Sequence, residues 1–272
     1  MIDDDAVCYR HGQKAASVAC QRCDRPICTQ CMTTASVGFH CPACVQTGAQ
    51  QVFDLSTMRK RARSSPLVTA LVVVNVIVFL LQGVAVNGRS VENWGILAGP
   101  LVASGDWWRV VTSGFLHADT MHLGSNMIGL YIFGNVVAPA IGNQRLALVY
   151  AGGLLGGTAA VLTFNWNVLA LGASGAVLGL VGGIVALSVA QGQSLRITGL
   201  MPLIVISLVI PLVSNVSFWG HLGGVAGGFA VGWLLIGLPV RFGASDQMAK
   251  GVATLAVVLL GAFGLYVGSN PF

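Results

Sequence analysis

The sequence predicts an all-α, multi-pass membrane protein that carries a small Cys/His module at its N-terminus. Of its 272 residues, 55% are hydrophobic and only 8% are charged, against about a quarter charged in an ordinary soluble domain. No carboxylate occurs between residues 120 and 245. All seven cysteines, in contrast, fall within the first 44 residues, where no long apolar run occurs. Two parts suited to different solvents are therefore joined in one chain, which argues against a soluble single domain.

The N-terminal part is expected to stay in the cytosol. The opening residues, Met1 to Asp5, lack the basic and apolar regions of a signal peptide. Thiols in the cytosol are kept reduced, so closely spaced cysteines indicate metal binding before disulfides. We assign residues 1–48 to this module and residues 49–65 to a linker with a basic end.

Seven apolar segments are predicted to cross the membrane as helices. They are Leu67–Leu81, Met121–Ala140, Leu146–Phe164, Ser174–Ala190, Ile197–Leu212, Gly220–Leu238 and Val252–Val267. The first six form a core over residues 66–238, and residues 239–272 hold a cytoplasmic loop and the seventh helix. The stretch from Asn87 to Leu116 is polar and rich in tryptophan, which predicts a structured loop at the membrane interface.

The basic residues predict the orientation of these helices. If the N-terminal module is cytoplasmic, that side holds Arg59, Lys60, Arg61, Arg63, Arg145, Arg196, Arg241 and Lys250. The opposite side holds only Arg89 and Arg109. This asymmetry fits the positive-inside rule, with a cytoplasmic N-terminus and an outer C-terminus, and we expect a bacterial cell membrane. The second, fourth and sixth spans then begin at the outer face.

Glycine is concentrated in the predicted spans. The chain has 36 glycines, and pairs spaced four apart occur at Gly175 and Gly179 and at Gly224 and Gly228. Such spacing lets helices approach closely in lipid, where no hydrophobic force drives them together. We therefore expect a compact bundle in which the glycine faces of the fourth and sixth spans touch.

Polar groups inside a membrane cost free energy, so the few present are informative. His122 and Asn126 are four apart and share one face of the second span. Ser174 begins the fourth span, where free backbone N–H groups and the helix dipole favour an oxyanion. His221 lies at the start of the sixth span, at a depth similar to that of Ser174. Taken singly, the Ser174 segment fits a packing face and His221 fits a histidine satisfied by water; together they fit a nucleophile and its base.

At these residues the sequence resembles the rhomboid intramembrane serine proteases. The resemblance rests on Gly172-Ala-Ser174-Gly175, on His117-xxxx-His122-xxx-Asn126 and on His221-xx-Gly224-xxx-Gly228, and extends over roughly Pro66 to Leu238. It implies a six-helix rhomboid bundle, with Ser174 as nucleophile and His221 as general base and then acid. It also implies that His122, Asn126 and the Ser174 backbone N–H are oxyanion donors. Trp108 and Arg109 match the family's Trp-Arg pair and would fix the interfacial loop, and His117 would be structural.

A Ser-His dyad explains the charge pattern more simply than a triad does. No acid lies within any span, and only Glu92, Asp106 and Asp119 lie on the outer side. The imidazole must then be oriented by packing. Here the chain departs from much of the family, since Leu178 stands where an aromatic residue often stacks on the base, and Gly220 replaces the usual alanine before the histidine.

The N-terminal module has the spacing of two zinc sites. Its four ligand pairs are Cys8 and His11, Cys20 and Cys23, Cys28 and Cys31, and Cys41 and Cys44, with His40 left over. Eight ligands suffice for two tetrahedral Zn²⁺ ions, which would supply the folding free energy that so small a core lacks. The spacing is similar to B-box fingers, which implies alternate pairing: Cys8, His11, Cys28 and Cys31 on one zinc, and the other four on the second. Sequential pairing and an unstructured cysteine-rich tail are the alternatives.

We therefore expect an intramembrane serine endopeptidase that needs no cofactor for catalysis and carries two structural Zn²⁺ ions. Its substrates would be membrane-anchored proteins cut near the outer interface. The zinc module would contact a cytoplasmic protein rather than nucleic acid, because its basic residues are nearly balanced by Asp3, Asp4, Asp5 and Asp24. A catalytically inactive membrane-protein binder on the same scaffold is the alternative, and a transporter is disfavoured by the lack of intramembrane carboxylates.

Overall fold

The computed structural model describes residues 5–35, 37–48, 64–86, 88–193 and 217–270. Its chain divides into two compact units, Met1–Ala62 and Arg63–Phe272. Each unit has its own buried core. They are therefore described separately.

The first unit is a small module with little regular structure. Strand β1 (Val18–Ala19) pairs antiparallel with β2 (Pro26–Ile27), and β3 (Thr33–Thr34) pairs with β4 (Phe39–His40). A short helical turn, η1 (Thr29–Cys31), lies between the hairpins, and α1 (Pro42–Gly48) follows them. The buried cluster at its centre consists of five cysteines and Ile27. Ile27, with the partly buried Val18, Met32 and Phe39 packed against the cluster, is a small apolar core for an independent unit.

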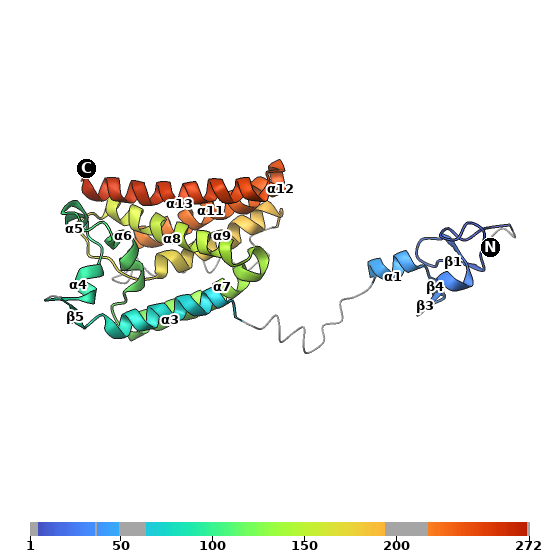
Figure 1. Cartoon of the computed structure of the whole chain (residues 1–272), viewed down its shortest axis with the longest axis horizontal. Helices are drawn as coiled ribbons and strands as arrows, with labels where there is room; N and C mark the ends of the chain where they lie inside the picture. The colour runs from blue at the N-terminus through green and yellow to red at the C-terminus, as the bar shows by residue number, and fades with distance from the viewer. Residues whose placement is uncertain (1–4, 36, 49–63, 87, 194–216, 271–272) are drawn as a thin grey trace. The chain divides into compact units, whose positions relative to one another are not determined.

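The second unit is mostly helical (Figure 1). Four of its helical segments are long and apolar enough to cross a membrane: α7 (Thr120–Ile141), α8 (Asn143–Phe164), the run Phe218–Phe242 and α13 (Asp246–Ser269). The run Phe218–Phe242 contains α11 (Phe218–Gly232), the π-helical turn η3 (Trp233–Gly237) and α12 (Leu238–Phe242). Two shorter apolar helices, α3 (Pro66–Leu81) and α9 (Ser174–Ala190), complete the described set. The expected span Ile197–Leu212 lies outside the described residues.

Side-chain caps explain where several helices begin. Ser65 accepts a hydrogen bond from the Val68 N–H at the start of α3, and Pro66 occupies the first helical position. Asp119, Ser217 and Ser245 accept the equivalent bonds at the starts of α7, α11 and α13. A cap satisfies one of the backbone N–H groups that have no partner within the helix. The apolar segments predicted from the sequence begin one or two residues after the observed starts of α3, α7 and α11, but six residues after the start of α13.

Glycine contacts hold α8, α9 and α11 together, which confirms the predicted contact between the glycine faces of α9 and α11. A Cβ added to Gly224 would overlap the Gly175 carbonyl oxygen, and one added to Gly228 would overlap that of Gly179. On the α8 side, a Cβ on Gly153 would lie 2.6 Å from the Gly179 Cα. Backbones this close allow only glycine, and the close approach supplies the van der Waals contact on which association in lipid depends.

A structured segment of short elements joins α3 to α7. It contains the hairpin of β5 (Ala85–Val86) and β6 (Arg89–Ser90), followed by α4 (Val91–Gly95), α5 (Gly99–Ala103), α6 (Arg109–Thr112) and the turn η2 (Ser113–Phe115). The guanidinium of Arg109 is buried and donates to the Asp106 carboxylate and to the carbonyls of Asn93 and Ile96. The Trp108 indole N–H donates to the Trp94 carbonyl. Trp108 and Arg109 thus hold this segment together, as the resemblance implies.

Candidate active site

Ser174 is the first residue of α9 and directly follows the loop between α8 and α9. The preceding Gly172 has a φ of +127°, a backbone conformation that side chains disfavour, and its N–H donates to the Ser113 carbonyl. The backbone N–H groups of the first turn of α9 have no partner within the helix, and no capping side chain takes their place.

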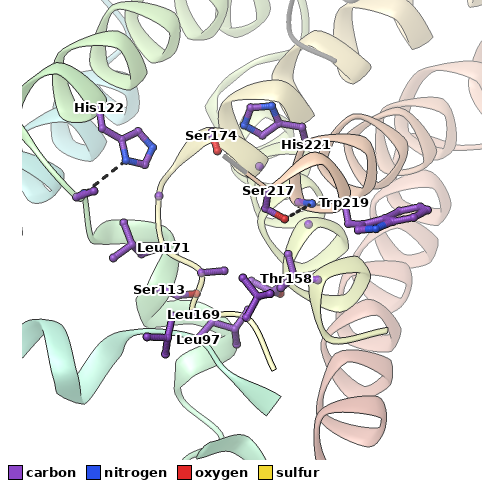
Figure 2. A pocket seen from close by; sticks show the side chains of 18 of the residues that line it. Leu97, Ser113, His122, Thr158, Leu169, Leu171, Ser174, Ser217, Trp219 and His221 are labelled. Carbon is purple, nitrogen blue, oxygen red and sulfur yellow. Dashed lines mark hydrogen bonds between the residues drawn. The ribbon is translucent and has the colours of Figure 1, made fainter. Parts of the chain in front are cut away.

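His221 lies next to Ser174 because α9 and α11 touch at their first turns. A Cβ added to Gly175 would lie 3.4 Å from the carbonyl oxygen of Gly220. Each of these glycines directly adjoins one member of the proposed pair. Figure 2 shows the Ser174 hydroxyl between the rings of His122 and His221, and all three residues line one cavity. The structure thus brings together two residues that lie 47 positions apart in the sequence.

His122 faces the same point from α7. Its Nδ1 accepts a hydrogen bond of 3.4 Å from the Ala118 N–H, so the ring proton must be on Nε2. A Cβ built on Gly172 would lie 2.8 Å from His122 Nε2 and 3.8 Å from Ser174 Oγ. The Nε2–H donor and the serine oxygen therefore approach one small volume beside Gly172.

Two buried donors near this point have no partner in the described part of the chain. They are His122 Nε2 and Asn126 Nδ2, one turn apart on α7. A buried polar group without a hydrogen bond is costly, and such groups cluster at functional sites. Donors left free in this way suit an anion that forms during a reaction.

The cavity lined by Ser174, His122 and His221 has a volume of about 960 Å³, and Asn126 is not among the described residues that line it. It is lined by α7, α8, α9 and α11, by the interfacial segment and by the loop between α8 and α9. The other residues that line it include Leu97, Ser113, Met121, Ser125, Leu154, Thr158, Val161, Asn165, Val168, Leu169, Ala170, Leu171, Ser217, Phe218 and Trp219. The wall is largely apolar, which suits a hydrophobic peptide segment.

The acids near the cavity have other roles in the structure. Asp106 forms an ion pair with Arg109, and Asp119 accepts a hydrogen bond from the His122 backbone N–H as the cap of α7. Among the described residues, Asp119 is the only acid that lines the cavity. The positions of Asp106 and Asp119 are therefore explained without a catalytic triad, in which a carboxylate would orient the His221 imidazole.

Comparison with known proteins places this arrangement in a family. The model of the Rhomboid domain matches residues 104–238, which include Ser174, His221, His122 and Asn126. YdcA, a rhomboid homologue of Bacillus subtilis (strain 168), is 33% identical over 142 residues, which cover 50% of this chain and 70% of YdcA. This chain belongs to the rhomboid family. Family members are intramembrane serine proteases.

Two further rhomboid relatives match a smaller part of their own length. The rhomboid protease GluP of Bacillus subtilis (strain 168) is 31% identical over 187 residues, or 66% of this chain and 36% of GluP. RHOMBOID-like protein 6, mitochondrial, of Arabidopsis thaliana is 31% identical over 159 residues, or 56% of this chain and 52% of that protein. The matched region of this chain thus spans between about a third and a half of these two relatives.

The two departures from the rhomboid pattern differ in how well the structure explains them. A Cβ at position 220 would lie 3.3 Å from both Ser217 Oγ and Val161 Cγ2, so little room exists for the usual alanine. Leu178 is buried, one turn after Ser174. Nothing in the structure explains why a leucine replaces the aromatic residue there.

Away from the rhomboid domain, the cysteine-rich unit forms two tetrads that could bind metal ions such as zinc. One consists of Cys8, His11, Cys28 and Cys31, and the other of Cys20, Cys23, Cys41 and Cys44, with the four ligand atoms of each within 4.8 Å of one another. The structure thus favours alternate over sequential pairing, and His40 belongs to neither tetrad.

The spacing of the ligand atoms fits tetrahedral zinc. His11 Nδ1 lies 3.3 Å from Cys28 Sγ and 3.4 Å from Cys31 Sγ, and Cys23 Sγ lies 3.7 Å from Cys41 Sγ. Tetrahedral bonds of about 2.0–2.3 Å place ligand atoms roughly 3.3–3.8 Å apart. The Cys41 backbone N–H also donates to Cys20 Sγ at 3.2 Å, which favours a thiolate.

The pKa values of two thiols in the first tetrad indicate how closely the sulfur atoms interact. Burial raises the pKa of Cys8, but backbone N–H groups of Cys28, Arg10 and His11 outweigh it and bring the pKa to about 6. In the same tetrad, burial and the neighbouring Cys8 raise the pKa of Cys31 to about 11. Several thiolates so close together repel one another, and a divalent cation removes that repulsion.

Sequence reasoning missed two features of the site. One is the contact of Gly172 with the His122 ring, and the other is Gln82, whose side chain holds the backbone of His117 from the end of α3. For Gln82, the only signal in the sequence was that a polar residue directly follows the apolar run Leu67–Leu81. That signal is weak, because polar residues commonly end membrane helices.

Proposed function

We propose that this chain is a serine endopeptidase that cleaves membrane-anchored proteins with Ser174 and His221. The observation that carries the proposal is the convergence of three groups on one cavity: the Ser174 hydroxyl at a helix start, the adjacent His221 imidazole and the His122 Nε2 donor. A fourth group, the buried Asn126 Nδ2, lies one turn further along α7 and, like His122 Nε2, has no partner among the described residues. Membership of the rhomboid family supports the same activity.

Each of the four groups has a role in peptide-bond hydrolysis. Ser174 Oγ attacks the carbonyl carbon of the scissile bond while His221 takes the hydroxyl proton. The carbonyl oxygen becomes an oxyanion, which accepts hydrogen bonds from His122 Nε2, Asn126 Nδ2 and the N–H groups that begin α9. His221 then gives its proton to the leaving amine as the C–N bond breaks. A water molecule attacks the acyl-enzyme, with His221 again as base, and releases Ser174.

The substrate must leave its helical conformation to be cut, because a helix buries its carbonyl carbons among its own hydrogen bonds. We propose that cleavage occurs near the outer interface, at segments that unwind easily. Helix α9 has 17 residues and is about 25 Å long, shorter than the roughly 30 Å of hydrocarbon. Its start would therefore lie below the membrane surface.

The proposed architecture is a core of six membrane helices over residues 66–238, followed by a seventh, with a cytoplasmic N-terminus and an outer C-terminus. The described helices α3, α7, α8, α9, α11 and α13 would form six of these seven spans, and four of the described helical segments are long and apolar enough to cross a membrane. We further propose that residues 1–48 bind two structural Zn²⁺ ions through the two tetrads and contact a cytoplasmic protein. Residues 49–65 would link the module to the core.

Reaction with a fluorophosphonate tests the proposed nucleophile without a known substrate. The serine oxygen attacks phosphorus, fluoride leaves, and the proton passes to His221. We expect the purified full chain to be labelled at Ser174, and the label to disappear in Ser174→Ala. Labelling that persists undiminished in Ser174→Ala, or its complete absence from folded wild-type protein, would favour the inactive binding scaffold.

A further inference from the structure

Gln82 directly follows α3 and reaches across to the start of α7. Its side chain is buried and bonds both polar backbone groups of His117. Gln82 Nε2 donates to the His117 carbonyl oxygen at 2.5 Å, and the His117 N–H donates to Gln82 Oε1 at 3.1 Å. A single amide side chain thus binds the backbone 35 residues away at two points. Such a double contact fixes the orientation of the backbone as well as its position.

The His117 carbonyl and the Ala118 N–H belong to one peptide unit, which is planar. By holding the carbonyl, Gln82 therefore sets the direction of the Ala118 N–H. That N–H donates to His122 Nδ1, the dashed line at His122 in Figure 2. A carbonyl that accepts a hydrogen bond also makes the N–H of the same peptide a better donor. These contacts connect Gln82, through the His117–Ala118 peptide, to the His122 imidazole.

This series of contacts ends at His122, whose Nε2–H is a proposed oxyanion donor. A ring nitrogen that accepts a hydrogen bond cannot also carry a proton, so the Ala118 N–H keeps the proton of neutral His122 on Nε2. The ring of His117 packs edge-on against His122, with centroids 5.2 Å apart. Burial, and to a smaller degree His122, lowers the pKa of His117 to about 4, so this neighbour adds no charge near neutral pH.

We propose that Gln82 is a positioning residue that sets the tautomer and the orientation of His122. The inference rests on the proposed function, because it assigns His122 the donor role in the oxyanion site. Gln82 itself would touch neither the substrate nor the reacting atoms. Its contribution would be made wholly through the His117–Ala118 peptide.

Kinetics of Gln82→Met test the proposal, since methionine keeps the length of the side chain but neither hydrogen bond. With a single-span membrane protein that the wild type cleaves, we expect kcat to fall about 10-fold and KM to stay unchanged, because an oxyanion donor acts mainly in the transition state. In a His122→Ala background the same change should have no further effect on kcat. A further loss in that background, comparable to the loss in the wild type, would overturn the proposal.

Asn135→Leu provides the matched control for a merely structural effect. Asn135 Oδ1 accepts a hydrogen bond of 2.7 Å from the Ser65 backbone N–H, and so joins α7 to the other end of α3. We expect this variant to lower the melting temperature about as much as Gln82→Met does, without the loss of kcat. An equal loss of kcat in both variants would assign Gln82 a structural role only.

A spectroscopic measurement separates this proposal from the proposed function. In ¹⁵N-histidine-labelled protein, the His122 signals are those lost in His122→Ala. We expect them to show a proton on Nε2 in the wild type and a mixture of tautomers in Gln82→Met. A proton on Nδ1 in the wild type, or an unchanged tautomer in Gln82→Met, would overturn the proposal even if the protein is an active protease. The measurement stays valid if Ser174 proves not to be a nucleophile.

Discussion

Asn126 differs from Ser174 and His221 in what its loss should cost. The two members of the dyad would act as one unit, whereas Asn126 would be one of several oxyanion donors. We therefore predict that Asn126→Ala lowers kcat by roughly 10- to 1,000-fold without abolishing cleavage. Steady-state kinetics on a single-span substrate measure this, with Asn135→Ala on the same helix as the control. A loss as complete as that of His221→Ala would contradict a shared oxyanion site.

Ser174, His221, His122 and Asn126 could be proposed as site residues from the sequence, because each is a polar residue near the start of an apolar run. The structure brings Ser174, His122 and His221 into one cavity. The contact between Gln82 and His117 could not be predicted, since it joins residues 35 apart through a loop whose path no local pattern specifies. The fit of Gly172 against the His122 ring was hidden for the same reason.

At the level of helices, glycine should matter only where backbones touch. A Cβ at Gly228 would overlap the Gly179 carbonyl, so we predict that Gly228→Ala lowers the free energy of unfolding by about 1–3 kcal/mol. Gly251 on α13 has nothing within 4 Å of an added Cβ, so Gly251→Ala should be neutral or slightly stabilising. Thermal unfolding in detergent compares the two variants. Equal melting temperatures would show that α9 and α11 do not pack as described.

The cysteine-rich unit offers a prediction about metal content. Because the tetrads are separate, Cys8→Ser should leave about one zinc per chain of the two that we expect in the wild type, and so should Cys20→Ser. His40→Ala should retain both, since His40 belongs to neither tetrad. Metal analysis of freshly purified, reduced protein gives the counts, and removal by a chelator should unfold the unit. If freshly purified wild-type protein contains no zinc, the proposal that the two tetrads bind structural zinc is wrong.

Helix positions were easier to predict than the structure between them. The expected Leu146–Phe164 span falls within α8, and the expected Ser174–Ala190 span matches α9. Residues 87–116 were predicted as an interfacial loop, but not its three short helices. The buried Arg109 joins α6 to the carbonyls of Asn93 in α4 and of Ile96 just after it, and such contacts have no periodic signature in a sequence.

For the whole molecule, the two ends of α8 provide a test of orientation. The helix has 22 residues and is about 33 Å long, so Gln144 in its first turn and Asn167, three residues after its end, should lie on opposite sides of a bilayer. Deleting residues 1–48 removes all seven cysteines. We predict that Gln144→Cys in this background reacts only with reagents that enter the cytosol, and Asn167→Cys with impermeant reagents outside. The reverse pattern would place the cavity at the cytoplasmic face.

Composition predicted the division of the chain into two parts, because all seven cysteines fall in the first part and the long apolar runs in the second. The structure divides the chain between Ala62 and Arg63, within the predicted basic linker. The identity of any partner of the cysteine-rich unit could not be predicted, since recognition of a partner depends on surface chemistry that has no counterpart within the chain. The substrate is hidden for the same reason.

The central claim is that Ser174 and His221 form one catalytic unit, and cleavage of a single-span protein by the purified full chain tests it most directly. We predict that Ser174→Ala and His221→Ala each abolish cleavage and that the double variant is no worse than either, because losses within one unit do not add. All three variants should retain the melting temperature of the wild type to within a few degrees. Full cleavage by Ser174→Ala would contradict the account.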